Sequence, residues 1–167
     1  FLTPTLSHRT DHALDVRRRI GTPEFVLKKM KKIQPSCFET FQTMHQAGVR
    51  IAMGTDMGFD PEMGSNAREL EIYVELGMTA MEALQTTTIN AATALKIDKD
   101  LGSLKAGKSA DIIAVAGNPA DDINLLQDKK NIHLVIKDGE VHVDRRDGQQ
   151  RSVISAEPGD WKIIDYL

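Results

Sequence analysis

The chain has 167 residues, of which 41% are hydrophobic and 27% charged, and this composition excludes an intrinsically disordered protein. The formal net charge is −3, and the 21 basic residues are interspersed among 24 acidic ones, so nucleic acid is not an expected partner. The single cysteine, Cys37, excludes an internal disulfide, and no segment has the roughly 18 apolar residues of a membrane span, so we expect a cytoplasmic protein with no membrane partner.

The first predicted elements are an extended segment and two helices. Residues 1–6 have the composition of a strand, and because the chain starts in this strand without a methionine, we expect a segment of a longer polypeptide. Thr22 and Pro23 predict the start of a helix that ends before Pro35, because proline lacks the amide that a helix interior needs. Ser36 and Glu39 form a capping-box pattern, which predicts that a second helix runs from there to Gly48.

A short apolar strand with an aspartate at its end is predicted next. Residues 49–54 are β-prone and largely apolar, as is typical of a parallel strand that helices cover, and Asp56 follows its carboxyl end. Further helices are predicted at residues 70–76 and, from a second capping box at Thr79 and Glu82, at residues 79–96. This alternation predicts β/α units of a parallel sheet. A complete (β/α)₈ barrel takes roughly 250 residues, so the chain has room for only its last part.

From Leu101 the sequence changes to a β pattern. Strands are predicted at residues 110–115, 132–137 and 141–143, and Asp138 and Gly139 are typical of a tight hairpin turn between the last two. We therefore expect a domain boundary near residue 99, which separates residues 1–99 from residues 100–167. In the polar tail, residues 161–164 are expected to form an edge strand or to dock on the core.

Asp56 is the candidate catalytic residue, because catalytic side chains of (β/α)₈ barrels project from the carboxyl ends of the strands. An aspartate in such a turn also commonly caps a backbone amide. Its position alone therefore leaves both interpretations open.

Several stretches resemble amidohydrolases of the imidazolonepropionase and Xaa-Pro dipeptidase (prolidase-like) group. The most specific is residues 101–112, LGSLKAGKSADI, and the others are GVRIAMGTD at residues 48–56, NAREL at 66–70, residues 77–92, GNP at 117–119, KDGEV at 137–141 and PTL at 4–6. The resemblance covers nearly all of residues 1–143. It implies an α/β fold, with the C-terminal part of a TIM-like (β/α)₈ barrel in residues 1–99 and part of a small β-sandwich domain, with its tail, in residues 100–167.

The resemblance also implies a reaction. A metal-activated water would attack the carbonyl carbon of a small amide substrate, namely a dipeptide, an N-acyl amino acid or a cyclic amide. Asp56 matches the family's aspartate that ligates the metal, takes the proton of the water and passes it to the leaving group. The implied cofactor is zinc, as one or two divalent ions.

Other ligands of the family's metal site have no counterpart in this sequence. These are the His-x-His pair of the first strand, a lysine or glutamate of the fourth, and histidines of the fifth and sixth. Met63 also stands where many relatives have a histidine. We expect the isolated chain to bind zinc poorly and to self-associate, or to associate with the missing N-terminal part, through uncovered strand edges. The alternative function is a truncated, non-catalytic fold or assembly module.

Two further groups of residues are candidates for the site. His8 and His12 are four apart, as in some helical zinc motifs, but no glutamate follows His8. A solvated or substrate-facing loop is therefore the preferred interpretation of both histidines. Asn66 and Glu69 follow the catalytic loop and are expected either to order it or to cap the next helix.

Overall fold

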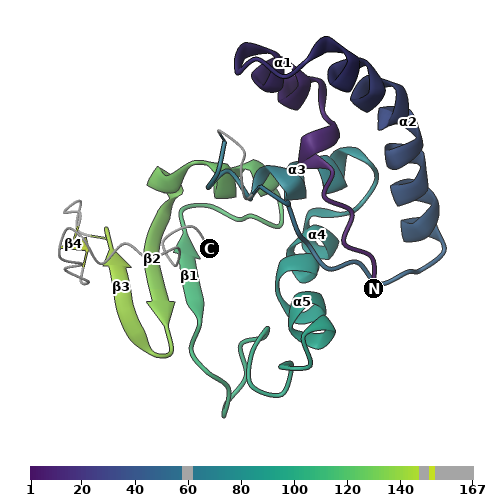
Figure 1. Ribbon diagram of the computed structural model, residues 1–167. Helices are drawn as coiled ribbons and strands as arrows, with labels where there is room; N and C mark the ends of the chain where they lie inside the picture. Colours follow the sequence, from purple (N-terminus) through teal and green to yellow (C-terminus); the bar gives the residue numbers. More distant parts are fainter. Residues whose placement is uncertain (58–61, 147–150, 153–167) are drawn as a thin grey trace.

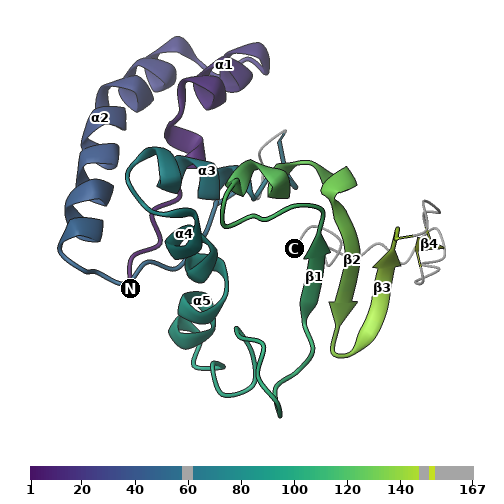
Figure 2. The same cartoon turned by 180° about the vertical axis from the view of Figure 1, so that it is seen from behind.

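A computed structural model describes residues 1–57, 62–146 and 151–152 (Figure 1). Its helices and strands, in chain order, are η1 (Ser7–Arg9), α1 (Asp11–Arg19), α2 (Glu24–Gln46), α3 (Arg68–Glu75), α4 (Ala80–Thr87), α5 (Ile89–Ala94), β1 (Ile112–Val115), η2 (Ile123–Gln127), η3 (Lys129–Asn131), β2 (Ile132–Lys137), β3 (Glu140–Asp144) and β4 (Arg151–Ser152). Figures 1 and 2 both show α3, α4 and α5 between the α1–α2 pair and the sheet. Within the described residues, no helix is long and apolar enough to cross a membrane.

The two strands predicted in the first half lie side by side and run parallel. Leu2 and Ile51 form a parallel bridge. The amide of Leu2 donates to the Arg50 carbonyl at 2.9 Å, and the amide of Ala52 donates to the Leu2 carbonyl at 3.0 Å. Because α1 and α2 connect these two segments, the order matches the predicted β/α unit, but the segments pair through a single parallel bridge and the first strand of the described residues is β1. The part of the chain that the structure describes does not close a barrel.

Helix α2 runs unbroken through Pro35, so the predicted break there is wrong. The buried residues Leu27, Gln34 and Phe41 are seven positions apart and therefore lie on one face, on both sides of the proline. A proline inside a helix removes one backbone hydrogen bond. Burial of a continuous face offsets that cost, and Ser36, inside the helix, caps nothing.

The core lies around α3. Tyr73 is fully buried, and its ring stacks on Phe41 of α2 with 4.9 Å between the centroids. The buried side chains of the core cluster come from most parts of the chain: Leu6, Phe41, Ile51, Leu70, Ile72, Tyr73, Met78, Ala83 and Ile123. Since Ile123 belongs to η2, the residues on either side of position 99 pack against each other. The boundary near residue 99 stays a prediction.

The second capping box is present, but the helix it starts is shorter than predicted. Thr79 Oγ1 accepts from the Glu82 amide at 3.2 Å, and the Glu82 carboxylate accepts from the Thr79 amide at 2.7 Å. At Thr88 the backbone leaves the helical region, with φ −117° and ψ −100°. The predicted single helix is therefore the pair α4 and α5.

The C-terminal strands form one antiparallel sheet in the order β1-β2-β3-β4, which confirms the three predicted strands. Asp138 and Gly139 connect β2 to β3, with φ values of 51° and 82°, and two left-handed residues in a row define the tight hairpin turn that their sequence predicts. The Asp138 amide also donates to Asp111 Oδ1 at 2.8 Å. The strand predicted at residues 161–164 lies outside the described residues.

Candidate functional site

Asp56 lies where the second parallel segment ends, and its side chain is exposed. Its φ is 55°, a left-handed conformation that few residues other than glycine adopt, although aspartate and asparagine tolerate it. Thr5, at the end of the neighbouring parallel segment, also has a positive φ, of 48°. Unusual backbone conformations of this kind are concentrated at functional sites. The carboxyl ends of the two segments therefore meet at a constrained edge that carries Asp56.

His8 holds the backbone at Asp56. The imidazole has only 8% of its surface exposed, and its Nε2 lies 2.6 Å from the carbonyl oxygen of Asp56. A carbonyl only accepts hydrogen bonds, so Nε2 carries the proton. On the other side of the ring, Arg17 Nη2 lies 3.3 Å from Nδ1. Because a guanidinium only donates, Nδ1 is the acceptor, and the two contacts together select the neutral Nε2–H tautomer.

Glu69 on α3 supports the segment that carries His8. Its carboxylate is fully buried and accepts hydrogen bonds from the Leu6 amide at 2.6 Å, the Ser7 amide at 2.7 Å and the Ser7 hydroxyl. The two residues predicted to order the loop are Asn66 and Glu69, and Glu69 is the one that forms hydrogen bonds with residues distant in the sequence. Asn66 precedes α3, and no side-chain hydrogen bond caps the helix at its first residues.

Tyr73 lies one helical turn after Glu69. Burial of the phenol, followed by the negative charge of Glu69, raises the pKa of Tyr73 far above its usual range. The phenol is therefore neutral at ordinary pH. The buried hydroxyl has no hydrogen-bond partner among the described residues. It places a polar group between α3 and the segment that leads to Asp56.

His12 has a different partner from His8. It lies in α1, where the sequence predicts a loop, so that prediction is wrong, and it pairs with Glu62. Glu62 also lies 3.8 Å from Arg68, at the start of α3. Since His8 faces the Asp56 carbonyl and His12 faces Glu62, the two histidines do not converge on a common point. The signal for α1 was Thr10, whose hydroxyl caps the helix by accepting from the Ala13 amide.

The described residues do not make a metal site by themselves. No group of three or more His, Cys, Asp or Glu side chains in this part of the chain is arranged to hold an ion. A catalytic zinc needs about three protein ligands and an open position. Of the metal ligands that the family resemblance implies, the described residues contain Asp56 alone.

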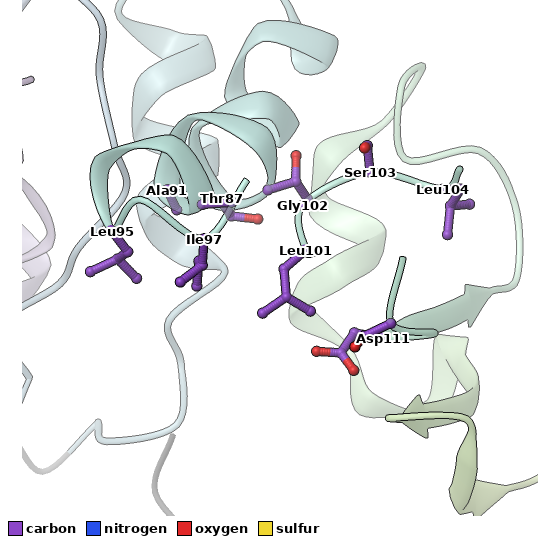
Figure 3. Close-up of a pocket in the computed structure, with 12 residues that line it drawn as sticks. Thr87, Ala91, Leu95, Ile97, Leu101, Gly102, Ser103, Leu104 and Asp111 are labelled. Atoms are coloured by element: carbon purple, nitrogen blue, oxygen red, sulfur yellow. The ribbon is translucent and has the colours of Figure 1, made fainter. Parts of the chain in front are cut away.

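A separate cavity lies at the junction between the helices and the sheet (Figure 3). It has a volume of about 370 Å³ and is bordered by α4, α5 and the loop that leads to β1. In Figure 3, Leu95 and Ile97, which follow α5, lie to the left of Leu101, and Asp111 lies to its right. Gly102 allows a close approach here, because a Cβ at its position would lie 2.6 Å from the Ala92 Cβ. Neither Asp56 nor His8 lines this cavity.

Comparison with known proteins gives a consistent set of relatives. A family profile described as "Amidohydrolase family" matches residues 13–142. Ochratoxinase from Aspergillus niger is 36% identical over 115 residues, which are 68% of this chain and 23% of that protein. Imidazolonepropionase from Sphingopyxis alaskensis is 36% identical over 140 residues, which are 81% of this chain and 34% of that protein.

Solved structures agree with these relatives. The crystal structure of a Xaa-Pro dipeptidase with bound methionine in its active site superposes with a TM-score of 0.72 and 40% identity, over 83% of this chain and 33% of the dipeptidase. The chain thus spans between about a quarter and about a third of the length of these three proteins.

Proposed function

The chain belongs to the amidohydrolase family, and we propose that it forms the C-terminal part of a metal-dependent hydrolase of amide-type bonds in which Asp56 is the catalytic carboxylate. The observation that carries the proposal is the placement of Asp56. Its carboxylate is exposed at the carboxyl end of a parallel strand segment, and its backbone is held in a left-handed conformation by a buried histidine. Catalytic groups of (β/α)₈ barrels lie at this end of the strands.

The reaction that we propose is attack of water on an amide carbon. A divalent ion, zinc in this proposal, would supply Lewis acidity that makes the water a stronger nucleophile at neutral pH. One carboxylate oxygen of Asp56 accepts a proton from the water as the new C–O bond forms. Asp56 then gives that proton to the amide nitrogen as the C–N bond breaks, so the carboxylate is regenerated and no further reactant is needed.

For the substrate, we propose a small amide: a dipeptide, an N-acyl amino acid or a cyclic amide. The names of the relatives support this class, since they include a Xaa-Pro dipeptidase and imidazolonepropionases. Asp56 lies on an open surface, and the substrate pocket would need further strands and loops around it. The net charge of −3 and the single cysteine support a cytoplasmic enzyme that does not bind nucleic acid.

The alternative function is a fold or assembly module without activity of its own. One observation favours it for this chain: the described residues do not group three metal-ligating side chains. The two functions predict different behaviour of a longer polypeptide that contains the other barrel strands: hydrolysis under the first and no activity under the second. The proposal expects activity only when the rest of a barrel is present.

The experiment is a hydrolysis assay on dipeptides, N-acyl amino acids and cyclic amides with added zinc, manganese or cobalt. It compares this chain with a polypeptide from the same source that contains the upstream barrel strands. We expect the longer polypeptide to hydrolyse at least one class, to lose this activity with a chelator and to regain it with metal, and we expect this chain alone to be inactive. A longer polypeptide that stays inactive with every metal and class would contradict the proposal and support the assembly module.

A further inference from the structure

We infer that Glu69 is a positioning residue for Asp56 and acts through Ser7 and His8. The inference rests on the proposed function in one respect only: Asp56 is the carboxylate whose direction matters. The contacts on which it depends join α3, the turn after residues 1–6, and the strand end at Asp56. These three parts of the chain are distant in sequence, so the contacts between them are tertiary.

The first step is from Glu69 to the turn. Glu69 is the second residue of α3 and is 0% exposed. One carboxylate oxygen accepts from the amide of Leu6, and the other accepts from the amide and hydroxyl of Ser7. Both oxygens are therefore used by residues 62 and 63 positions earlier in the chain. Charge-assisted hydrogen bonds in a buried site are among the strongest that a protein makes, so they fix two consecutive peptide groups of the turn.

The second step is from Ser7 to His8. The short helix η1 starts at Ser7 and includes His8, and the Arg9 amide closes it by donating to the Leu6 carbonyl at 2.8 Å. Thr10 Oγ1 donates to the Ser7 carbonyl at 3.0 Å. Because the peptide groups of residues 6 and 7 are fixed by Glu69, the direction in which η1 presents the next side chain, His8, is fixed as well.

The third step is from His8 to Asp56. The Nε2–H group of His8 donates to the Asp56 carbonyl at 2.6 Å, which sets the plane of the peptide after Asp56. With φ at 55°, Asp56 is in a narrow region of backbone conformation. Rotation of the peptide group that follows Asp56 would therefore also turn the Cα–Cβ bond of Asp56. The hydrogen bond from His8 therefore sets the direction of the carboxylate. Glu69 itself makes no hydrogen bond to Asp56 and is fully buried, so its effect on Asp56 passes through Ser7 and His8.

Glu69→Gln in the 167-residue chain tests the inference, with Glu75→Gln as the matched control. Glu75 is on the same helix and exposed, so both variants lose one negative charge from α3. The glutamine amide has one oxygen and one donor group, so it leaves at least one of the Leu6 and Ser7 amides without an acceptor. We expect that amide to exchange its hydrogen about tenfold faster or more in the Glu69 variant alone.

The deciding readouts are the ¹⁵N shifts of the His8 imidazole and the ¹³C shift of the Asp56 carbonyl. If Glu69 positions Asp56, both shifts change in Glu69→Gln and stay constant in Glu75→Gln, while the signals of β2 stay constant in both. If the Leu6 and Ser7 amides exchange faster but the His8 and Asp56 signals stay as in the wild type, Glu69 only stabilises the fold and the inference is overturned.

A milder variant covers the case in which Glu69→Gln does not fold. Ser7→Ala removes only the hydroxyl donor and keeps both amide contacts with Glu69. It should shift the His8 and Asp56 signals in the same direction by a smaller amount, and unchanged signals would contradict the inference. None of these readouts needs turnover. A failure of Asp56 as a catalytic residue would therefore appear only in the turnover of an Asp56→Asn variant, and a failure of Glu69 as a positioning residue would appear only in these spectra.

Discussion

His8 Nε2 and the carbonyl oxygen of Asp56 are 2.6 Å apart, although 48 positions separate the two residues in the sequence. This contact joins the ends of the two parallel segments. It also means that the one histidine next to the candidate catalytic residue uses Nε2 to hold backbone, while Nδ1 faces Arg17. His8 therefore acts in this structure as a structural support of Asp56.

The isolated chain should bind zinc weakly and below one equivalent. Asp56 supplies one carboxylate, and neither His8 nor His12 is directed at a common point with it. Metal analysis after purification, followed by calorimetric titration with zinc, measures this directly. His8→Gln should bind zinc as weakly as the wild type. One equivalent of zinc that stays bound through dialysis would contradict the expectation.

Replacement of Pro35 by alanine should stabilise the protein by about 1–3 kcal/mol. Proline inside a helix destabilises the folded protein by about 3 kcal/mol relative to alanine. Alanine also makes the unfolded chain more flexible, and this offsets only about 0.4–1 kcal/mol of the gain in stability. Pro35 is exposed, so the change leaves the core intact. Urea unfolding measures the effect, with Lys32→Ala on the same helix as a control that changes stability by less than about 0.5 kcal/mol. A Pro35→Ala protein that is no more stable than the wild type would mean that α2 is interrupted in solution.

The capping box of α4 should make stability depend on pH in the acid range. The backbone amide of Thr79, followed by its hydroxyl, donates to Glu82 and lowers the pKa of that carboxyl below its usual range. A depressed folded-state pKa stabilises the protein above the unfolded-state pKa of glutamate, about 4.3, and this contribution is lost as the pH falls through the folded-state value. Glu82→Ala should therefore be less stable than the wild type at pH 7, and the difference should narrow below pH 4.

Urea unfolding at pH 7 and at about pH 3 checks this expectation, with exposed Glu75→Ala as the control. Thr79→Ala, which removes the other half of the box, should cost about 1 kcal/mol at pH 7. A Glu82→Ala deficit of equal size at both pH values would show that the carboxylate charge contributes nothing to the cap.

The sequence predicted best those features that depend on neighbouring residues. The hairpin at Asp138 and Gly139 and the capping box at Thr79 and Glu82 are examples, because turn and cap chemistry acts over two to four positions. The break predicted at Pro35 was wrong because the helix face it interrupts is buried against other elements, and local propensity does not report burial.

The same distinction explains the candidate site. The strand pattern of residues 49–54 was enough to place Asp56 at a strand end. The sequence indicates Glu69 as a candidate to order the loop only through its position after Asp56, whereas its partners Leu6 and Ser7 are more than 60 positions away. Tertiary hydrogen bonds of this kind leave no local pattern in one sequence.

We propose that the chain associates with itself through the open edge of its first segment. The backbone of Leu2 forms hydrogen bonds with Arg50 and Ala52 on one edge of the first segment. On the other edge, within the described residues, the backbone amide and carbonyl of Thr3 have no hydrogen-bond partner. A groove of about 260 Å³ lies between this segment and α2, lined by Leu2, Pro4, Leu6, Ile33, Ser36, Cys37, Thr40 and Phe41. An uncovered strand beside an apolar groove favours pairing with another chain.

Sedimentation velocity over a wide concentration range should show a species larger than the monomer that grows with concentration. Ile33→Lys, in the groove, should weaken this association. Phe25→Lys makes the same kind of change at an exposed site on the same helix but outside the groove, and should leave the association unchanged. A monomer at every concentration would rule out this surface.

The most direct test of the central claim is kcat/KM of Asp56→Asn in a polypeptide that contains the complete barrel. Asparagine is nearly isosteric and tolerates the left-handed φ of 55° at this position, so the fold and melting temperature should be kept. It cannot accept the proton of the water, and general acid–base groups contribute about 10²–10⁴-fold. We therefore expect kcat/KM to fall at least about a hundredfold, with exposed Asp100→Asn unaffected. A loss of less than about tenfold in a folded Asp56→Asn protein with normal metal content would show that Asp56 only caps its turn, and would contradict the catalytic assignment.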